Sequence, residues 1–234
     1  MTALVSVQNL VKNYQALRPL RIQQLTVDEA QLVSVFGLDA PAAEMFVGLL
    51  TGALLPDEGE VRLFGRSTAH IEDSDAWLAM LDGIGIVTER AVLIEAFTVE
   101  QNIAMPFTLE VDPVRPDVKP VVEALGREVG LATAVLQVPV ARAGDEARVR
   151  VRLARALALD PKLLLAEHPS ASLPREAVKT FAADLARIAA RRRLAVLTMT
   201  ADSAFANALG GQLLTHEPAT GTLTTPSVWR KLFG

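Results

Sequence analysis

Short apolar runs and longer segments of helical periodicity alternate along the chain. Residues 4–10 alternate apolar and polar side chains, as a half-buried strand does. Residues 31–37 form an apolar, β-branched run, which is typical of a buried central strand. On these criteria we predict strands at residues 4–10, 20–27, 31–37, 61–64, 84–87, 162–166 and 194–199.

Helical segments separate several of these strands. In the first, Phe46, Leu49 and Leu50 recur at helical spacing, and Asp39 is placed to cap the helix start. A stretch with three prolines, residues 112–120, predicts an exposed connection at the boundary of an insert. Strands that alternate with helices indicate an α/β protein whose mostly parallel sheet is covered by helices on both faces. The helices are expected at residues 41–55, 121–129, 144–159 and 175–192.

Composition narrows the class of protein. The 234 residues are 50% hydrophobic and 21% charged, which excludes a disordered chain and suffices for one large domain or a domain with an insert. The net charge of −4 argues against nucleic-acid binding, which needs clustered positive charge. The absence of cysteine fits a reducing compartment, so a cytoplasmic location is expected.

One long segment carries a family resemblance. Residues 150–173 read RVRLARALALDPKLLLAEHPSASL, and residues 98–106 read TVEQNIAMP. The first is closely similar to the segment from signature helix to Walker B strand and D-loop in ATP-binding cassette (ABC) transporter ATPase subunits, and the second to the family's segment after the Q-loop. Tyr14 stands where that family places an aromatic that stacks on adenine. The chain thus resembles ABC nucleotide-binding subunits over nearly its whole length.

The resemblance implies a fold and a domain plan. We expect the ABC-ATPase fold, in which a P-loop NTPase-like, mostly parallel core sheet has helices on both faces. An antiparallel β subdomain at the N-terminus and a small helical insert accompany this core. A single domain over residues 1–234 is expected, with the insert at about residues 89–148.

The family's phosphate loop, G-x-x-x-x-G-K-[ST], is altered in this chain. The matching residues read GLDAPAAE, and only Gly37 retains the pattern. Ala42 replaces the second glycine, Ala43 the lysine that neutralises phosphate, and Glu44 the hydroxyl residue that holds Mg²⁺. Pro41 also removes a backbone N–H group. Together these changes indicate that phosphate binding has been lost.

The other ATP-site positions that the resemblance assigns also differ. Glu89 stands at the Q-loop glutamine, Glu167 at the metal-linked aspartate, His168 at the general base and Ala201 at the switch histidine. The signature Leu-Ser-Gly-Gly-Gln is matched by Ala143, Gly144, Asp145, Glu146 and Ala147.

Two interpretations of the altered residues remain open. In one, Glu167 holds a Mg²⁺-bound water and His168 takes a proton, which requires a bound triphosphate. In the favoured one, His168 is structural and hydrogen-bonded at the end of its strand, while His70 and His216 are ordinary residues of surface loops.

Charged residues near two helix starts suggest that some of the changes are organised. Asp39 with Glu44, and Asp145 with Glu146, lie where the family's ATP phosphates meet helix N-termini, and each pair is placed to satisfy such an end permanently. Random drift at unused positions is the alternative. An arginine stripe on the signature helix is expected to form ion pairs on a solvated face; its members are Arg148, Arg152 and Arg155.

These observations favour a catalytically degenerate ABC transporter ATP-binding-type subunit with a structural or regulatory role. The expected partners are a membrane-embedded transporter subunit, and a second copy or another ABC subunit in a homodimer or heterodimer. The expected location is cytoplasmic, peripheral on the inner face of the cytoplasmic membrane. No catalytic residue, cofactor, metal or nucleic acid is expected. Candidate contacts to the membrane subunit are Phe97, Val99, Ile103, Met105 and Phe107.

The alternatives are an active but divergent ATPase, which would use ATP and Mg²⁺ through Tyr14, Glu167 and His168, and a scaffold that has left transport.

Overall fold

The computed structural model describes residues 3–71 and 73–225, so residues 1, 2, 72 and 226–234 of the expected domain lie outside it. Its strands form two sheets. The smaller is antiparallel in its paired strands and has the order β2-β1-β4-β5. It is built from β1 (Ala3–Lys12), β2 (Leu20–Asp28), β4 (Glu58–Leu63) and β5 (Arg66–Ser67).

The larger sheet has the order β10-β9-β3-β8-β7-β6, and every neighbouring pair except β10 with β9 is parallel. The mostly parallel core and the antiparallel N-terminal part that we expected are therefore confirmed. The strands of this sheet are β3 (Leu32–Phe36), β6 (Ile84–Val87), β7 (Leu163–Glu167), β8 (Ala195–Thr200), β9 (Gln212–Glu217) and β10 (Thr222–Thr224).

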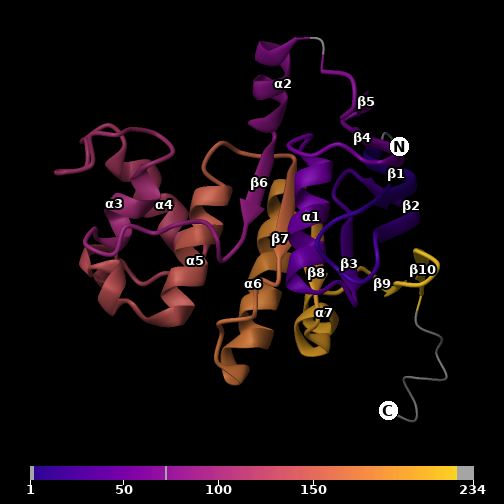
Figure 1. Ribbon diagram of the computed structural model, residues 1–234. Coiled ribbons are helices and arrows are strands. Elements are labelled where there is room, and N and C mark those ends of the chain that lie inside the picture. Colours follow the sequence, from indigo (N-terminus) through magenta and orange to yellow (C-terminus); the bar gives the residue numbers. More distant parts are fainter. Residues whose placement is uncertain (1–2, 72, 226–234) are drawn as a thin grey trace.

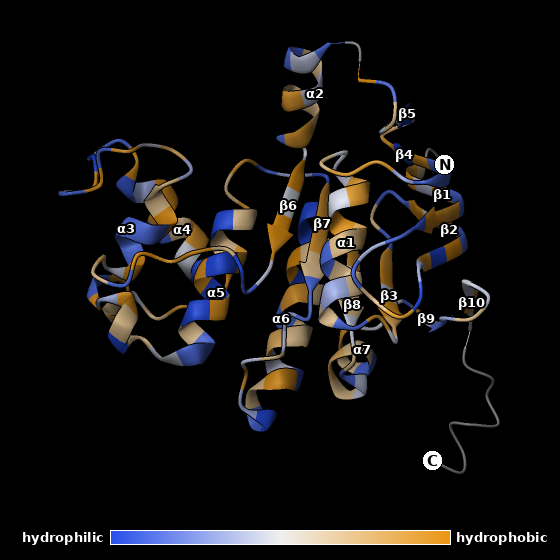
Figure 2. Cartoon of the chain, viewed as in Figure 1, coloured by the Kyte–Doolittle hydropathy of each residue, from blue (hydrophilic) through white to orange (hydrophobic). Residues whose placement is uncertain are grey.

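Successive residues of the central strands point to opposite faces and enter two different cores. Leu163 and Leu165 of β7 pack with Phe46 and the antiparallel sheet. Leu164 of β7 packs instead with Phe181 and the helices of the other face. Figure 2 shows hydrophobic residues along these strands and hydrophilic ones on α5. Burial on both faces explains why the strand sequences are continuously apolar rather than alternating.

The helices lie on both faces of the large sheet and beyond its β6 edge. In Figure 1, α3, α4 and α5 gather on the far side of β6 from the antiparallel sheet. Among the described residues, no helix is long and apolar enough to span a membrane. The helices are α1 (Ala40–Leu50), α2 (Ser74–Leu81), α3 (Val99–Ala104), α4 (Lys119–Glu128), α5 (Gly144–Ala156), α6 (Arg175–Arg192) and α7 (Ser203–Leu209).

The first helix is shorter than its sequence pattern predicted. We expected it to continue to Leu55, but α1 ends at Leu50. Gly52 follows with a φ of +72°, a left-handed conformation that stops a helix. A Cβ atom on Gly52 would lie 2.4 Å from Cζ2 of Trp77, so the α2 tryptophan packs directly on this backbone.

We predict that Gly52→Ala destabilises the protein more than Gly65→Ala does. Both glycines have positive φ, but a Cβ on Gly65 would have no atom within 4 Å. Both variants therefore lose stability through backbone strain, and only the alanine at position 52 also collides with Trp77. Urea unfolding should show an additional loss of about 1–3 kcal/mol for Gly52→Ala. Equal losses would show that Trp77 moves aside freely.

Candidate functional site

The connection between β3 and α1 is only three residues long. Strand β3 ends at Phe36 and the helix begins at Ala40, inside the stretch that matches the phosphate loop. The Asp39 carboxylate accepts a hydrogen bond of 2.9 Å from the N–H of Ala42, which confirms the predicted cap. The N–H of Ala43 donates to the Asp39 carbonyl, also at 2.9 Å. These two backbone donors are therefore used within the chain.

The second carboxylate expected at this helix end has another partner. Glu44 lies beyond the first turn, and its carboxylate accepts from Nη1 of Arg90 at 2.8 Å. The expectation that Glu44 helps to satisfy the start of α1 is therefore wrong. The pattern of charges along one segment cannot reveal that a distant arginine lies closer.

Arg90 also binds Glu167, whose side chain is only 7% exposed at the end of β7. Its Nη2 lies 2.5 and 2.7 Å from the two carboxylate oxygens, and its Nε donates at 3.3 Å. The Thr88 hydroxyl donates to the same carboxylate at 2.9 Å. Hydrogen bonding to Glu167 raises the pKa of Arg90, so the guanidinium stays protonated.

Arg90 was not predicted from the sequence as a site residue. The available signal was a basic residue three positions after the strand 84–87. In the structure β6 lies parallel to β7, so the residues that follow both strands meet at one sheet edge. Glu89, the neighbouring residue that the resemblance selected, is exposed, and its carbonyl accepts from Arg152.

The His168 ring is not hydrogen-bonded as we expected. Its backbone has a φ of +42°, and its N–H donates to the Met199 carbonyl at 2.8 Å. The ring atom Nε2 is buried without a partner in the described part of the chain. His168 and Ala201 line a cavity of about 320 Å³, where the Ser170 hydroxyl donates to Asp202. No described group of three or more His, Cys, Asp or Glu side chains is placed to hold a metal ion.

The residues that match the signature lie at the start of α5. Gly144 is the first helical residue, and Ala143 before it makes no side-chain cap. Asp145 and Glu146 are exposed in the first turn, and Glu146 pairs with Arg150 at 3.0 Å instead of capping. The proposed satisfaction of this helix end by two carboxylates is thus wrong, because Glu146 accepts from Arg150 and neither carboxylate accepts a described hydrogen bond from a backbone N–H at this end.

The arginine stripe on α5 binds a chain segment rather than solvent-exposed carboxylates. Arg152 donates to the carbonyls of Glu89 and Ala91 at 3.3 and 3.2 Å, and Arg155 donates to that of Val92 at 2.8 Å. Burial lowers the pKa of both arginines. Only Arg148 forms an expected ion pair, with Glu95 at 2.7 Å. The stripe therefore fixes the segment that carries Arg90.

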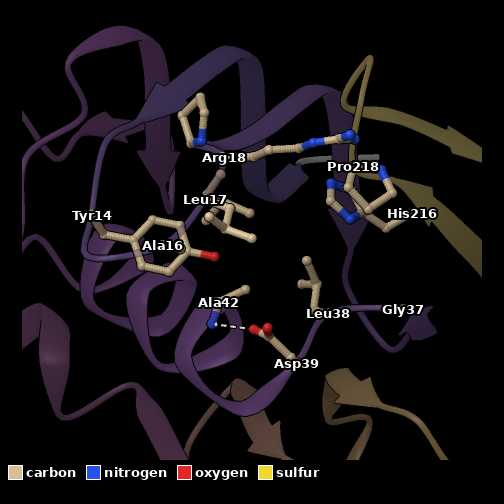
Figure 3. A pocket seen from close by; sticks show the side chains of 12 residues that line it. Tyr14, Ala16, Leu17, Arg18, Gly37, Leu38, Asp39, Ala42, His216 and Pro218 are labelled. Atoms are coloured by element: carbon tan, nitrogen blue, oxygen red, sulfur yellow. Dashed lines mark hydrogen bonds between the residues drawn. The ribbon is translucent and has the colours of Figure 1, made fainter.

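Tyr14 lies beside a cavity of about 550 Å³ that also touches Gly37, Asp39 and Ala42 (Figure 3). Partial burial, and to a lesser extent the Asp39 charge, raises the pKa of Tyr14.

His216 lines the same cavity. We expected this residue in a surface loop, but it is buried in β9, with Nε2 at 2.8 Å from the carbonyl oxygen of Arg21. Its strand was not predicted from the sequence, because the segment is short and mixes polar with apolar residues.

The structure thus groups the candidate residues at separate places. Tyr14 and Gly37 share one cavity, Glu44 and Glu167 share Arg90, and His168 with Ala201 share another cavity.

Comparison with known proteins supports the resemblance. The chain is 28% identical over 220 residues to the lipoprotein-releasing system ATP-binding protein LolD of Alcanivorax borkumensis, covering 92% of this chain and 96% of that protein. It is 30% identical over 176 residues to the methionine import ATP-binding protein MetN of Brucella abortus, covering 75% of this chain but 47% of that protein. No family model matches the chain.

Solved structures share the fold. The dimeric bacterial ABC transporter cassette MJ0796 superposes with a TM-score of 0.76 at 20% identity, covering 94% of this chain and 96% of that one. CbiO1 of Clostridium perfringens, part of the ABC transporter complex cbiONQ, superposes with a TM-score of 0.77 at 16% identity, covering 100% and 91%. The architecture is therefore that of an ABC nucleotide-binding cassette. Taken with the sequence relatives, this places the chain in the family of ABC transporter ATP-binding subunits.

We predict that Asp39→Ala destabilises the protein and that Asp145→Ala does not. Both aspartates lie at the start of a helix, but only Asp39 accepts a hydrogen bond from a backbone N–H there. Loss of a cap of this kind costs about 1 kcal/mol, whereas an exposed acidic residue in the first turn contributes a few tenths. Chemical unfolding of the two variants measures the difference. Equal effects would contradict the assigned cap.

Proposed function

We propose that this chain is a catalytically degenerate ABC transporter ATP-binding-type subunit. Its role is then structural or regulatory, and it docks on membrane-embedded transporter subunits without powering them. The observation that carries the proposal is the structure of residues 37–44, which match a phosphate loop. Here these residues form the Asp39 cap and the first turn of α1.

A phosphate loop works by directing free backbone N–H groups at phosphate oxygens. Here Pro41 has no N–H, and those of Ala42 and Ala43 are bonded to Asp39. An approaching phosphate would also meet the Asp39 carboxylate, and like charges repel strongly in a poorly solvated site. No lysine stands at Ala43 to offset this repulsion.

The residues at the positions that would catalyse ATP hydrolysis are also altered. The Ala201 methyl cannot hydrogen-bond a γ-phosphate, and Nε2 of His168 finds no partner among residues 3–71 and 73–225 that would hold the ring in one orientation. Glu89, at the Q-loop position, is exposed. These features support loss of hydrolysis beyond loss of binding.

Mg-ATP should neither stabilise the protein nor be hydrolysed by it. Ligand binding to the folded state raises the melting temperature, by several degrees when the ligand is present at about 100 times its Kd. We expect less than about 1 °C of shift in millimolar Mg-ATP, and no phosphate release above background. A LolD relative measured alongside serves as the positive control.

A clear shift, together with turnover that disappears in His168→Ala, would establish the second candidate function. That candidate is an active but divergent ATPase that uses ATP and Mg²⁺. The observation in its favour is the open cavity beside Tyr14, which is large enough for a nucleoside.

The proposed partner is a membrane-embedded transporter subunit, and the proposed location is the inner face of the cytoplasmic membrane. A homodimer, or a heterodimer with another ABC subunit, completes the assembly, and no nucleic acid takes part. The relatives named for lipoprotein release and methionine import support a place in a transporter.

The five apolar residues that we expected to contact the membrane subunit are engaged in the core of this chain, so we propose a different docking surface. Val99 and Ile103 are fully buried, and the others, Phe97, Met105 and Phe107, pack partly against the same core. A neighbouring groove of about 290 Å³ is lined by Ala91, Pro106 and Leu159, among others. Val92, which adjoins Ala91 in the chain, is 76% exposed. We therefore assign the contact to this groove and its margin.

We predict that Val92→Asp and Leu159→Asp abolish co-purification with the proposed membrane-embedded transporter subunit. The substitutions put a charge into an apolar contact, whereas the matched control Leu78→Asp alters an exposed leucine on α2. All three variants should melt as the wild type does. If the first two variants co-purified as the wild type does, the proposed docking surface would be wrong. If the wild type itself did not co-purify, the proposed partner would be wrong.

A further inference from the structure

The cluster around Glu167 is built around a positive charge that belongs to the chain itself. A carboxylate buried at a strand end requires hydrogen-bond donors or a counter-ion, because the protein interior solvates charge poorly. Arg90 and Thr88, which both follow β6, supply these donors to Glu167. The register of β6 against β7 thus places donor and acceptor at the same sheet edge.

The same guanidinium reaches a second element. Its Nη1 binds Glu44 of α1 at 2.8 Å while Nη2 holds Glu167. One cation therefore lies between two carboxylates that come from different sides of the site. By the resemblance, residues 44 and 167 are positions that would hold Mg²⁺ and its bound water in an ABC ATPase.

A divalent ion does not fit this arrangement. Both oxygens of Glu167 are within 2.7 Å of Nη2 of Arg90, so a metal bound to that carboxylate would adjoin a guanidinium. Within residues 3–71 and 73–225, no group of three or more His, Cys, Asp or Glu side chains offers an alternative set of ligands.

We infer that Arg90 is a resident cation that takes the place of the divalent metal and holds Glu44 and Glu167 together permanently. This inference deepens the proposed function and rests on it in one respect, namely that the site has no metal–nucleotide complex to bind. It goes further by naming the group that occupies the site and the elements that this group joins.

The segment that carries Arg90 is itself held in place. Arg152 and Arg155 of α5 donate to the carbonyls of residues 89, 91 and 92, on both sides of Arg90 in the chain. The guanidinium therefore connects α1 and β7 to a segment fixed on α5. The contacts that tie these elements together need neither metal nor nucleotide.

The first test compares Arg90→Met with Arg62→Met in thermal unfolding. The two arginines are 49% and 50% exposed and each forms an ion pair, but Arg62 pairs with Glu60, which is 39% exposed, and Arg90 pairs with the buried Glu167. We expect Arg90→Met to lower the melting temperature by about 5 °C or more, and Arg62→Met by about 2 °C or less. Equal losses would overturn the inference.

The second test adds MgCl₂, MnCl₂ or CaCl₂ at millimolar concentration, with EDTA as the reference. The wild-type melting temperature should not change, because the arginine fills the site. That of Arg90→Met should rise by about 2 °C or more, because the two carboxylates then lack a cation. The rise should disappear in Arg90→Met/Glu167→Gln. Metal stabilisation of the wild type, or none of Arg90→Met, would overturn the inference.

Two further measurements keep the test decisive. If Arg90→Met does not fold, Arg90→Lys keeps the charge without the fork of donors. This variant should melt below the wild type and show no response to metal. A metal response of Arg90→Lys would overturn the inference. Metal stabilisation of the wild type without ATP turnover would defeat the inference alone, whereas ATP turnover would defeat the proposed function and with it the premise of the inference.

Discussion

The organisation of the site depends on one buried carboxylate. Glu167 ends a strand that is buried along its whole length, so its charge must be balanced by groups that the fold brings to that edge of the sheet. Arg90 meets this need and, through Glu44, also joins the first helix to the sheet. Arg152 and Arg155 of α5 in turn fix the segment on which Arg90 lies. The fold thus supplies from its own side chains the positive charge at this edge.

The start of α1 follows the same principle with the opposite sign. A helix N-terminus presents unpaired N–H groups and a partial positive charge, which attract an anion. Here Asp39 provides the anion from within the chain. The chain therefore provides its own anion, Asp39, at the start of α1 and its own cation, Arg90, at the end of β7. Both ends are satisfied without a ligand. This consistency is the physical basis for proposing a subunit that keeps the ABC architecture without its ATP chemistry.

Retention of the fold without hydrolysis is thermodynamically reasonable in this architecture. The two cores are formed by aliphatic and phenylalanine side chains from opposite faces of one sheet, and the candidate ATP-site positions lie at the ends of strands and helices. Most substitutions at such ends change caps and ion pairs, worth about 1 kcal/mol for a cap, and the small side chains of Ala42 and Ala43 are accommodated within the core. Residues at the ends of helices and strands can therefore be substituted while the packing of the sheets and helices is retained.

The sequence alone determined the elements with strong local signals. The sequence predicted α6 at 175–192 as a helical segment and β6 at 84–87 as a short apolar run, both with the observed bounds, since each signal lies within the segment itself. Asp39 was recognisable as a cap because its carboxylate and the N–H of Ala42 that donates to it are only three residues apart. The tertiary structure decided what depends on distant segments, namely the partners of Glu44 and Glu167, the burial of His216 and the carbonyl contacts of the α5 arginines. Arg90 lies 46 and 77 residues from its two carboxylates, and only the parallel pairing of β6 with β7 brings the latter contact about.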